Sequence, residues 1–137
     1  METKEVGLFI IKPDGRDLQE EEFVNPIIKS LGLEIINRRE IVFSEEQLKE
    51  FYSDKQDERS KDFFPYLGFR SSILLIIEGE ETNNKLIGVK RLTRKTFNHD
   101  NFYTGTHCSD NEIQALEELK ILDIDYAKVR INLPAIQ

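Results

Sequence analysis

Three apolar runs constrain the fold of this chain more than any other feature of its sequence. Residues 6–11 (VGLFII) and 72–79 (SILLIIEG) are almost continuously apolar, as is typical of central strands that are buried on both faces. Residues 33–43 (LEIINRREIVF) read as another strand. Residues 101–106 (NFYTGT) form a weaker candidate, because Gly105 lowers the strand propensity. The sequence therefore predicts a sheet of four strands.

Helical spacing of apolar residues separates these strands. The first strand ends at the turn-forming KPDG (residues 12–15), and apolar positions then recur every three or four residues from Phe23 to Leu31, with Gly32 as a stop. Pro26 is compatible with this helix if the first turn begins near Phe23.

Capping residues indicate the other helix starts. Ser44 with Gln47, and Ser109 with Glu112, match the capping-box pattern, and Thr82 is expected to cap a further helix. The apolar faces of these helices are expected at Leu48, Phe51 and Tyr52, at Leu86, Val89 and Leu92, and at Ile113, Leu116 and Leu119.

The order of these elements is typical of a split βαβ sheet, an α+β (α/β) sandwich with helices packed on one face. At the C-terminal end, alternating Val129, Ile131 and Leu133 predict a short edge strand. With 137 residues and no linker or repeat, we expect a single domain over residues 1–137, with a core at about 6–120 and a tail at 121–137.

Composition disfavours several classes of function and excludes a few kinds of site. A net charge of −7 disfavours nucleic acid and anionic membranes as partners. No apolar run reaches the ~20 residues of a membrane span, and the N-terminal residues do not resemble a secretory signal, so a cytoplasmic location is expected. Cys108 is the one cysteine, which excludes an internal disulfide and a multi-cysteine zinc site.

His107 is the main candidate for chemistry. It lies where a strand is expected to end and a helix to begin, a place suited to anions because the first amides of a helix are unpaired. Neutral imidazole can attack phosphorus without a separate base. The alternatives are a hydrogen-bonded turn histidine and a nucleophilic pair with Cys108, although consecutive residues of an extended chain point to opposite sides. The basic cluster at residues 90–95 (KRLTRK) is either a solvated helix end or a phosphate-binding surface.

Four motifs resemble those of nucleoside diphosphate kinases, in the family's order: FIIKPDG, FYSDK…DFFPYL, VKRLTRKT and HCSDN…EEL. The resemblance runs from about residue 6 to residue 119. It implies a ferredoxin-like sandwich with a four-stranded antiparallel sheet covered by helices. It also implies transfer of the γ-phosphate of a nucleoside triphosphate, usually ATP, to a nucleoside diphosphate by a ping-pong mechanism through phospho-His107.

The resemblance also implies the roles of individual residues. The catalytic set is His107 with Lys12, and with Ser109 and Glu118, which match the residues that orient the imidazole. A helix from His107 to Glu118 would be roughly 16 Å long, so their contact requires the chain to turn back. The positions that match the family's substrate-binding residues are Tyr52, Phe63 (base stacking), Leu67, Lys90, Thr96 and Thr104. Arg94 stands where the family usually has glycine, and it is a candidate, with Arg91 and Lys95, to replace the phosphate-binding arginine that is missing here. Mg²⁺ would arrive with the nucleotide phosphates, without a dedicated metal site on the protein.

The chain departs from the family pattern between Thr96 and His107. Only FNHDNFYTGT (residues 97–106) stands where the family has a longer loop with a second phosphate-binding arginine. Because that loop supplies much of the family's hexamer contact, a homodimer is the preferred assembly here. Two other functions stay open: a kinase-like module that binds a nucleotide or a protein without turnover, and an RNA-binding ferredoxin-like domain, which the acidic charge disfavours.

Overall fold

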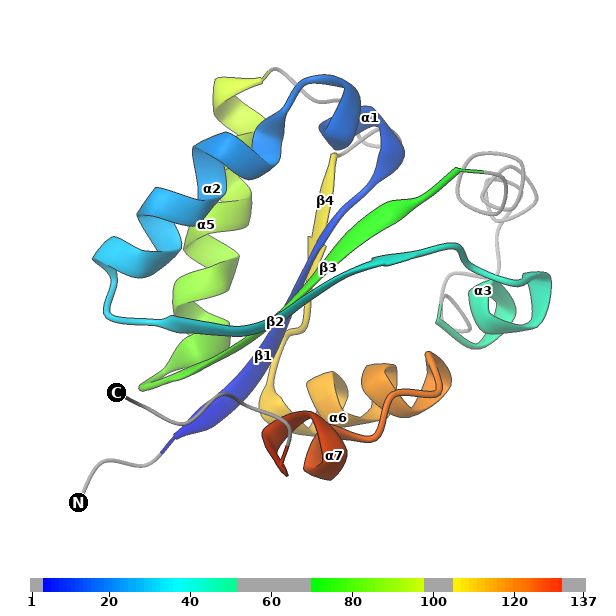
Figure 1. Ribbon diagram of the computed structural model, residues 1–137. Coiled ribbons are helices and arrows are strands. Elements are labelled where there is room, and N and C mark those ends of the chain that lie inside the picture. The colour runs from blue at the N-terminus through cyan, green and yellow to red at the C-terminus, as the bar shows by residue number, and fades with distance from the viewer. Residues whose placement is uncertain (1–3, 52–69, 98–104, 132–137) are drawn as a thin grey trace.

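A single four-stranded sheet forms the centre of the molecule (Figure 1). The computed structural model describes residues 4–51, 70–97 and 105–131. The strands are β1 (Glu5–Ile11), β2 (Glu34–Ile41), β3 (Ser72–Gly79) and β4 (Thr106–Cys108), in the order β2-β3-β1-β4 with antiparallel neighbours throughout. The two most apolar runs are the two central strands, as the sequence predicted, and the predicted fold class is confirmed.

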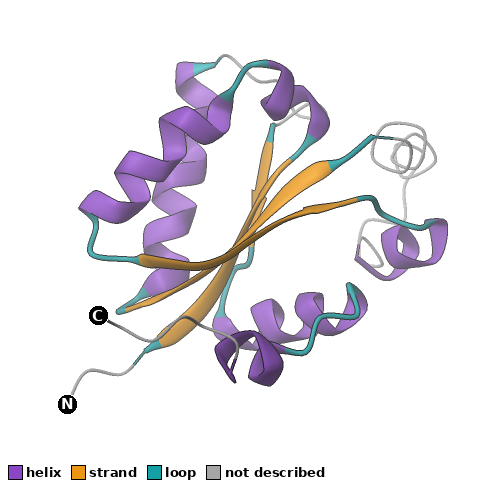
Figure 2. Ribbon diagram, viewed as in Figure 1, coloured by secondary structure: helices purple, strands orange, loops and turns teal. Residues whose placement is uncertain are grey.

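Helices cover both faces of this sheet (Figure 2). α2 (Glu20–Ser30) and α5 (Thr82–Thr96) lie on one face, and α3 (Glu45–Phe51), α6 (Glu112–Ile121) and α7 (Tyr126–Ile131) lie on the other. The expectation of helices on one face was therefore wrong. The physical reason is that both sets of alternating side chains in β1 and β3 are apolar, so each face needs a cover.

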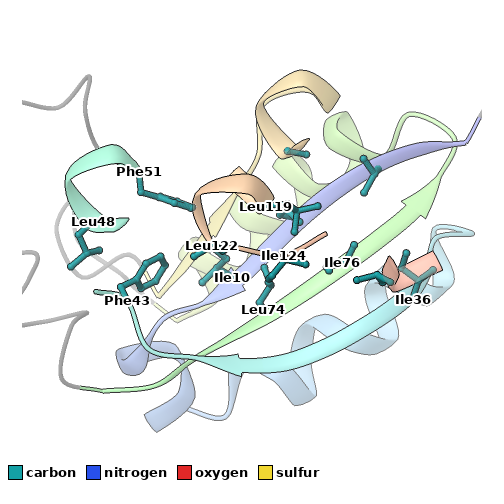
Figure 3. Close-up of a cluster of buried hydrophobic side chains, with 14 residues drawn as sticks. Ile10, Ile36, Phe43, Leu48, Phe51, Leu74, Ile76, Leu119, Leu122 and Ile124 are labelled. Carbon is teal, nitrogen blue, oxygen red and sulfur yellow. The ribbon is translucent and has the colours of Figure 1, made fainter. Parts of the chain in front are cut away.

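Two hydrophobic clusters fill the layers on either side of the sheet. The first contains Leu8 and Ile10 of β1 with side chains of α3, α6 and α7, and Figure 3 shows Phe51 pointing from α3 into it. The second contains Phe9 and Ile11 with side chains of α2 and α5. Neighbouring residues of β1 thus belong to different clusters.

Several predicted element boundaries were wrong. The KPDG segment begins a short helix, α1 (Pro13–Asp17), instead of forming a simple turn. α2 begins at Glu20, before Phe23, so that Pro26 lies inside the helix. The fourth strand comprises Thr106–Cys108 and includes His107, whereas residues 101–104 of the predicted strand lie outside the described residues.

The capping predictions had mixed outcomes. The Ser44–Gln47 box is confirmed, because each residue's backbone N–H donates to the other's side chain, at 2.9 and 3.1 Å. Thr82 does not cap α5, since its hydroxyl donates to the Glu5 carbonyl at 2.7 Å and Glu81 holds the N-cap position.

The capping box predicted for Ser109 and Glu112 does not form at the start of α6. Asn111 caps this helix by accepting from the Gln114 N–H at 2.8 Å. The side chains of Ser109 and Glu112 bind amides of β1 instead. Three residues predicted on apolar helix faces are exposed, namely Leu92, Ile113 and Leu116.

The predicted C-terminal edge strand is a helix. The Asp125 carboxylate accepts from the N–H groups of Ala127 and Lys128, which starts α7. Tyr126 and Arg130, one turn apart, then hydrogen-bond the two oxygens of Glu78, whose side chain is 3% exposed at the end of β3. Of the predicted strand residues, Val129 is buried in α7, Ile131 ends the helix, and Leu133 lies outside the described residues.

Candidate active site

The site centres on His107 in the edge strand β4. His107 pairs with Ile10 of β1, so its imidazole lies on the face that α3 and α6 cover. The side chain is 21% exposed, and its Nε2 lies 2.9 Å from Oε2 of Glu118. The ring is therefore held by a carboxylate while remaining accessible from solvent.

α6 brings Glu118 to the histidine by running antiparallel to β4. Its first residue, Glu112, accepts a hydrogen bond from the Val6 N–H near the start of β1, whereas Glu118 reaches His107, opposite Ile10. The chain thus reverses direction between Ser109 and Asn111. A continuous helix from His107 to Glu118 would separate the two residues by roughly 16 Å, whereas this reversal brings them into contact.

The Glu118 carboxylate is deeply buried. Its side chain is 6% exposed, and its Oε1 has no hydrogen-bond partner within the described ranges. Desolvation makes a buried charge dependent on the few groups near it, so the imidazole is an important partner of this carboxylate.

Phe51 contacts the imidazole from α3. The two ring centroids lie 5.0 Å apart with an interplanar angle of 61°, and Phe51 also packs edge-to-face on Phe43. α3 is fixed by its capping box and by the Gln47 amide, which donates to the Ile121 carbonyl of α6 at 3.3 Å. The imidazole thus lies between an aromatic wall and a carboxylate. Sequence reasoning assigned Phe51 to the core and missed this contact.

Lys12 lies just beyond β1. It is the N-cap of α1 and has an extended backbone, so alternation continued from Ile10 would direct its side chain to the face of His107. Lys12 is 8% exposed, and its backbone N–H donates to the Gly105 carbonyl at 2.8 Å, next to the start of β4.

Ser109 is fully buried, and its side chain forms hydrogen bonds with residues of β1 and α5. Its hydroxyl accepts from the Leu8 N–H at 3.1 Å and donates to Oδ1 of Asn83. Because the single hydroxyl proton is given to Asn83, the Ser109 hydroxyl has no proton left to donate to the imidazole.

Lys90 and Arg94 lie one turn apart on α5, half-buried beside β4. α5 begins next to Glu5, so its last turns reach the end of β1 where Lys12 lies. Burial raises the pKa of the Cys108 thiol to about 11, while the positive charges of Lys90 and Arg94 act in the opposite direction. Thr96 is exposed at the end of the same helix. Tyr52, Phe63, Leu67 and Thr104 lie outside the described residues.

Neither a metal centre nor a membrane span is found in the described parts of the chain. Within them, no group of three His, Cys, Asp or Glu side chains is arranged to hold a metal ion. No helix among them combines the length and apolarity needed to cross a bilayer.

The fold is the ferredoxin-like α+β sandwich, and solved structures share it. A nucleoside diphosphate kinase of Aquifex aeolicus superimposes with a TM-score of 0.75 at 19% identity, over 87% of this chain and 94% of that one. A nucleoside diphosphate kinase of Encephalitozoon cuniculi gives a TM-score of 0.78 at 16% identity, over 97% of this chain and 94% of that one.

The sequence itself identifies the family. The family model described as nucleoside diphosphate kinase matches residues 5–123, and the chain therefore belongs to the nucleoside diphosphate kinase family. Family and fold together place it among the nucleotide phosphotransferases. No curated protein sequence matches the chain.

Proposed function

We propose that this protein is an active nucleoside diphosphate kinase that transfers the γ-phosphate of a nucleoside triphosphate, usually ATP, to a nucleoside diphosphate through phospho-His107. The observation that carries the proposal is the 2.9 Å contact between His107 Nε2 and the buried Glu118 carboxylate. This pair has the composition and geometry of an oriented nucleophile.

Glu118 selects the reactive nitrogen. A carboxylate accepts hydrogen bonds, so Nε2 carries the proton, and the neutral imidazole has its free electron pair on Nδ1. In the first half-reaction, Nδ1 forms a bond to the γ-phosphorus while the bond from that phosphorus to the bridging oxygen breaks. The nucleoside diphosphate leaves with the electron pair of that bond. The second half-reaction reverses these steps with another diphosphate.

Charge on Glu118 favours the transfer. The imidazole ring becomes positive as Nδ1 donates its electron pair, and the buried carboxylate at Nε2 stabilises that charge more strongly than water would. Phe51 restricts rotation of the ring, which keeps Nδ1 aligned with the phosphorus.

The phosphates require positive charge in an otherwise acidic protein. We assign this role to Lys12, which follows β1, and to Lys90 and Arg94 of α5, whose charges act on Cys108, the neighbour of His107 in β4; the Thr96 hydroxyl would be a further donor. Phe63 and Leu67 would contact the base, and Tyr52 and Thr104 would lie near the phosphate and the sugar.

Mg²⁺ belongs to the nucleotide in this proposal. It neutralises charge on the transferring phosphates and enters and leaves with the substrate.

We further propose a cytoplasmic homodimer. The short segment between Thr96 and β4 lacks the loop expected to support larger assemblies. Sedimentation analysis of the purified protein tests this assembly, and a hexamer would contradict it.

Intact-mass measurement tests the function directly. The purified protein is incubated briefly with Mg-ATP and then with a second nucleoside diphosphate. One acid-labile phosphoryl group should appear and then disappear as the matching triphosphate forms. The His107→Ala variant should bind nucleotide and fold normally but gain no phosphoryl group. Nucleotide binding without phosphorylation of the unmodified protein would instead identify a kinase-like binding module.

A further inference from the structure

A buried asparagine connects three elements behind the histidine. Asn83, the second residue of α5, is 2% exposed. Its Oδ1 accepts from the hydroxyl of Ser109, two residues after His107, and its Nδ2 donates to the Val6 carbonyl at 3.0 Å and to Glu5 Oε1 at 2.5 Å. The side-chain amide of Asn83 thus links α5 to β1 and to the connection from β4 to α6.

The directions of these hydrogen bonds are fixed. A carbonyl and a carboxylate only accept, so the amide nitrogen of Asn83 must face Val6 and Glu5. Its oxygen must then face Ser109, whose hydroxyl must donate. A side chain with only donors or only acceptors could not replace this asparagine.

The same hydrogen bonds mark the point where β4 ends. The Leu8 N–H of β1 binds the Ser109 hydroxyl at 3.1 Å, and the Ser109 N–H returns a bond to the Leu8 carbonyl at 3.2 Å. The next amide on that edge, Val6 N–H, binds the Glu112 carboxylate at 2.8 Å. The side chains of Ser109 and Glu112 therefore accept the hydrogen bonds of β1 amides that a longer β4 would accept with its backbone. The backbone after Ser109 can thus turn away from the sheet and begin α6.

The point of departure determines where the catalytic carboxylate lies. α6 begins at Glu112 and carries Glu118 less than two turns later. A shift of Ser109 would move the start of α6 relative to β4, and would thereby change the separation of His107 and Glu118.

We propose that Asn83 is a positioning residue for phosphoryl transfer, which it controls by holding Ser109 and thereby the path from β4 into α6. This inference rests on the proposed function for its kinetic consequence. Asn83 acts through Ser109 and takes no part in the chemistry.

The kinetic test compares two adjacent alanine variants. Asn83→Ala should slow phosphorylation of His107 by about 10- to 100-fold at saturating Mg-ATP, with little change in KM, because small displacements of reacting groups have effects of this size. Thr82→Ala is the matched control. It removes another hydrogen bond between the start of α5 and β1, from the Thr82 hydroxyl to the Glu5 carbonyl, which does not involve Ser109. Equal losses in the two variants would overturn the proposal.

A double-mutant cycle tests whether Asn83 acts through Ser109. The rates of Ser109→Ala and of Asn83→Ala/Ser109→Ala should agree within about twofold, because the second substitution removes a partner that is already lost. Multiplicative losses would show that Asn83 acts by another route. If Asn83→Ala does not fold, Asn83→Ser retains a polar residue at the helix start with a shorter reach, and the same outcomes apply.

Nitrogen NMR of the imidazole gives a readout that does not depend on turnover. The chain has one other histidine, His99, so the His107 signals can be assigned by substitution. Asn83→Ala should lower the fraction of His107 with its proton on Nε2, whereas Thr82→Ala should leave that fraction unchanged. If the unmodified protein forms no phosphohistidine, the proposed function fails, and this comparison still decides the positioning role: unchanged tautomer populations in Asn83→Ala would refute it.

Discussion

The imidazole of His107 lies 2.9 Å from the carboxylate of Glu118, although the two residues belong to different elements. The contact joins an edge strand to a helix that runs back along it. Its geometry therefore depends on the turn between these elements as much as on the two side chains. Any change that lets α6 slide along the sheet would separate the pair.

Glu118→Gln should reduce phosphorylation of His107 by at least about 100-fold while preserving the fold. Glutamine can donate as well as accept, so it no longer fixes the proton on Nε2, and it lacks the charge that stabilises the cationic ring. The rate of phosphohistidine formation measures the effect. Glu117→Gln, at an exposed neighbour on the same helix, makes the same change in charge and should leave the rate unaltered. A Glu118→Gln variant with normal activity would contradict the assignment of Glu118.

Glu78 should make the stability of the protein depend on pH in the acidic range. Burial alone would raise the pKa of this carboxyl, but hydrogen bonds from Arg130 and Tyr126 and the charges of Arg130 and Lys4 outweigh burial and lower it below 4.5. Because the pKa of Glu78 is lower in the folded protein than in the unfolded chain, its ionisation stabilises the folded state at pH values above the pKa of the unfolded chain. This contribution is lost as the pH falls through the pKa of the folded protein. Glu78→Gln should therefore lower the free energy of unfolding by about 1–3 kcal/mol near neutral pH.

Urea unfolding at several pH values measures this contribution. The difference between the unmodified protein and Glu78→Gln should shrink once the pH falls below the ordinary value of 4.5. Glu34→Gln is the control, because Glu34 pairs with Glu78 across β2 and β3 but is exposed. A difference that stays constant with pH would show that the ionised carboxylate is not what holds α7.

Cys108 should be inert toward thiol reagents in the folded protein. Burial raises the pKa of its thiol to about 11, so little thiolate forms near neutral pH, and the side chain is only 2% exposed. We expect labelling at about pH 8 to be at least roughly 100-fold slower than in denaturant. Cys108→Ala should retain phosphorylation of His107. Rapid labelling, or loss of phosphorylation in Cys108→Ala, would revive the interpretation of Cys108 as a nucleophile.

Gly7→Ala should destabilise the protein and slow phosphorylation together. A β-carbon at Gly7 would lie 2.9 Å from Oδ1 of Asn83 and 2.9 Å from a methyl group of Thr82, so the start of α5 would have to move away from β1. We expect a loss of about 1–3 kcal/mol in the free energy of unfolding.

Gly88→Ala provides the contrast for this test. A β-carbon at Gly88, in the interior of the same helix, would meet no atom within 4 Å. This substitution should therefore increase stability by about 0.5–1 kcal/mol and leave activity unchanged. If Gly7→Ala proved as harmless as Gly88→Ala, α5 and β1 would not be held at close approach.

The sequence predicted those elements whose signal is local. Continuous apolar runs identified β1 and β3, and the Ser44–Gln47 spacing identified the start of α3. The C-terminal residues were misread because alternation of Val129 and Ile131 fits a strand, while the stronger signals were the cap at Asp125 and a buried carboxylate far away in the sequence.

The site was harder to predict because its contacts join distant parts of the chain. The pairing of Glu118 with His107 could be inferred only from resemblance, since helical spacing alone separates the two residues. Phe51 had the spacing of an ordinary core residue, and Asn83 that of a polar residue at a helix start. Phe51 contacts His107, and Asn83 contacts Ser109, only when α3 and α5 pack on the sheet that contains β4.

The double cover of the sheet limits how this protein can meet a nucleotide. In many nucleic-acid-binding domains with a four-stranded sheet, bases stack on an open sheet face. Here α6 and α7 lie across that face, and the side chains beneath them, such as Leu8 and Ile76, are fully buried. A single strand of nucleic acid therefore cannot lie along this sheet face with its bases stacked on the strands. The side chain of His107 stays 21% exposed in the edge strand β4, and under the proposed function the terminal phosphate of a single nucleotide would reach it there.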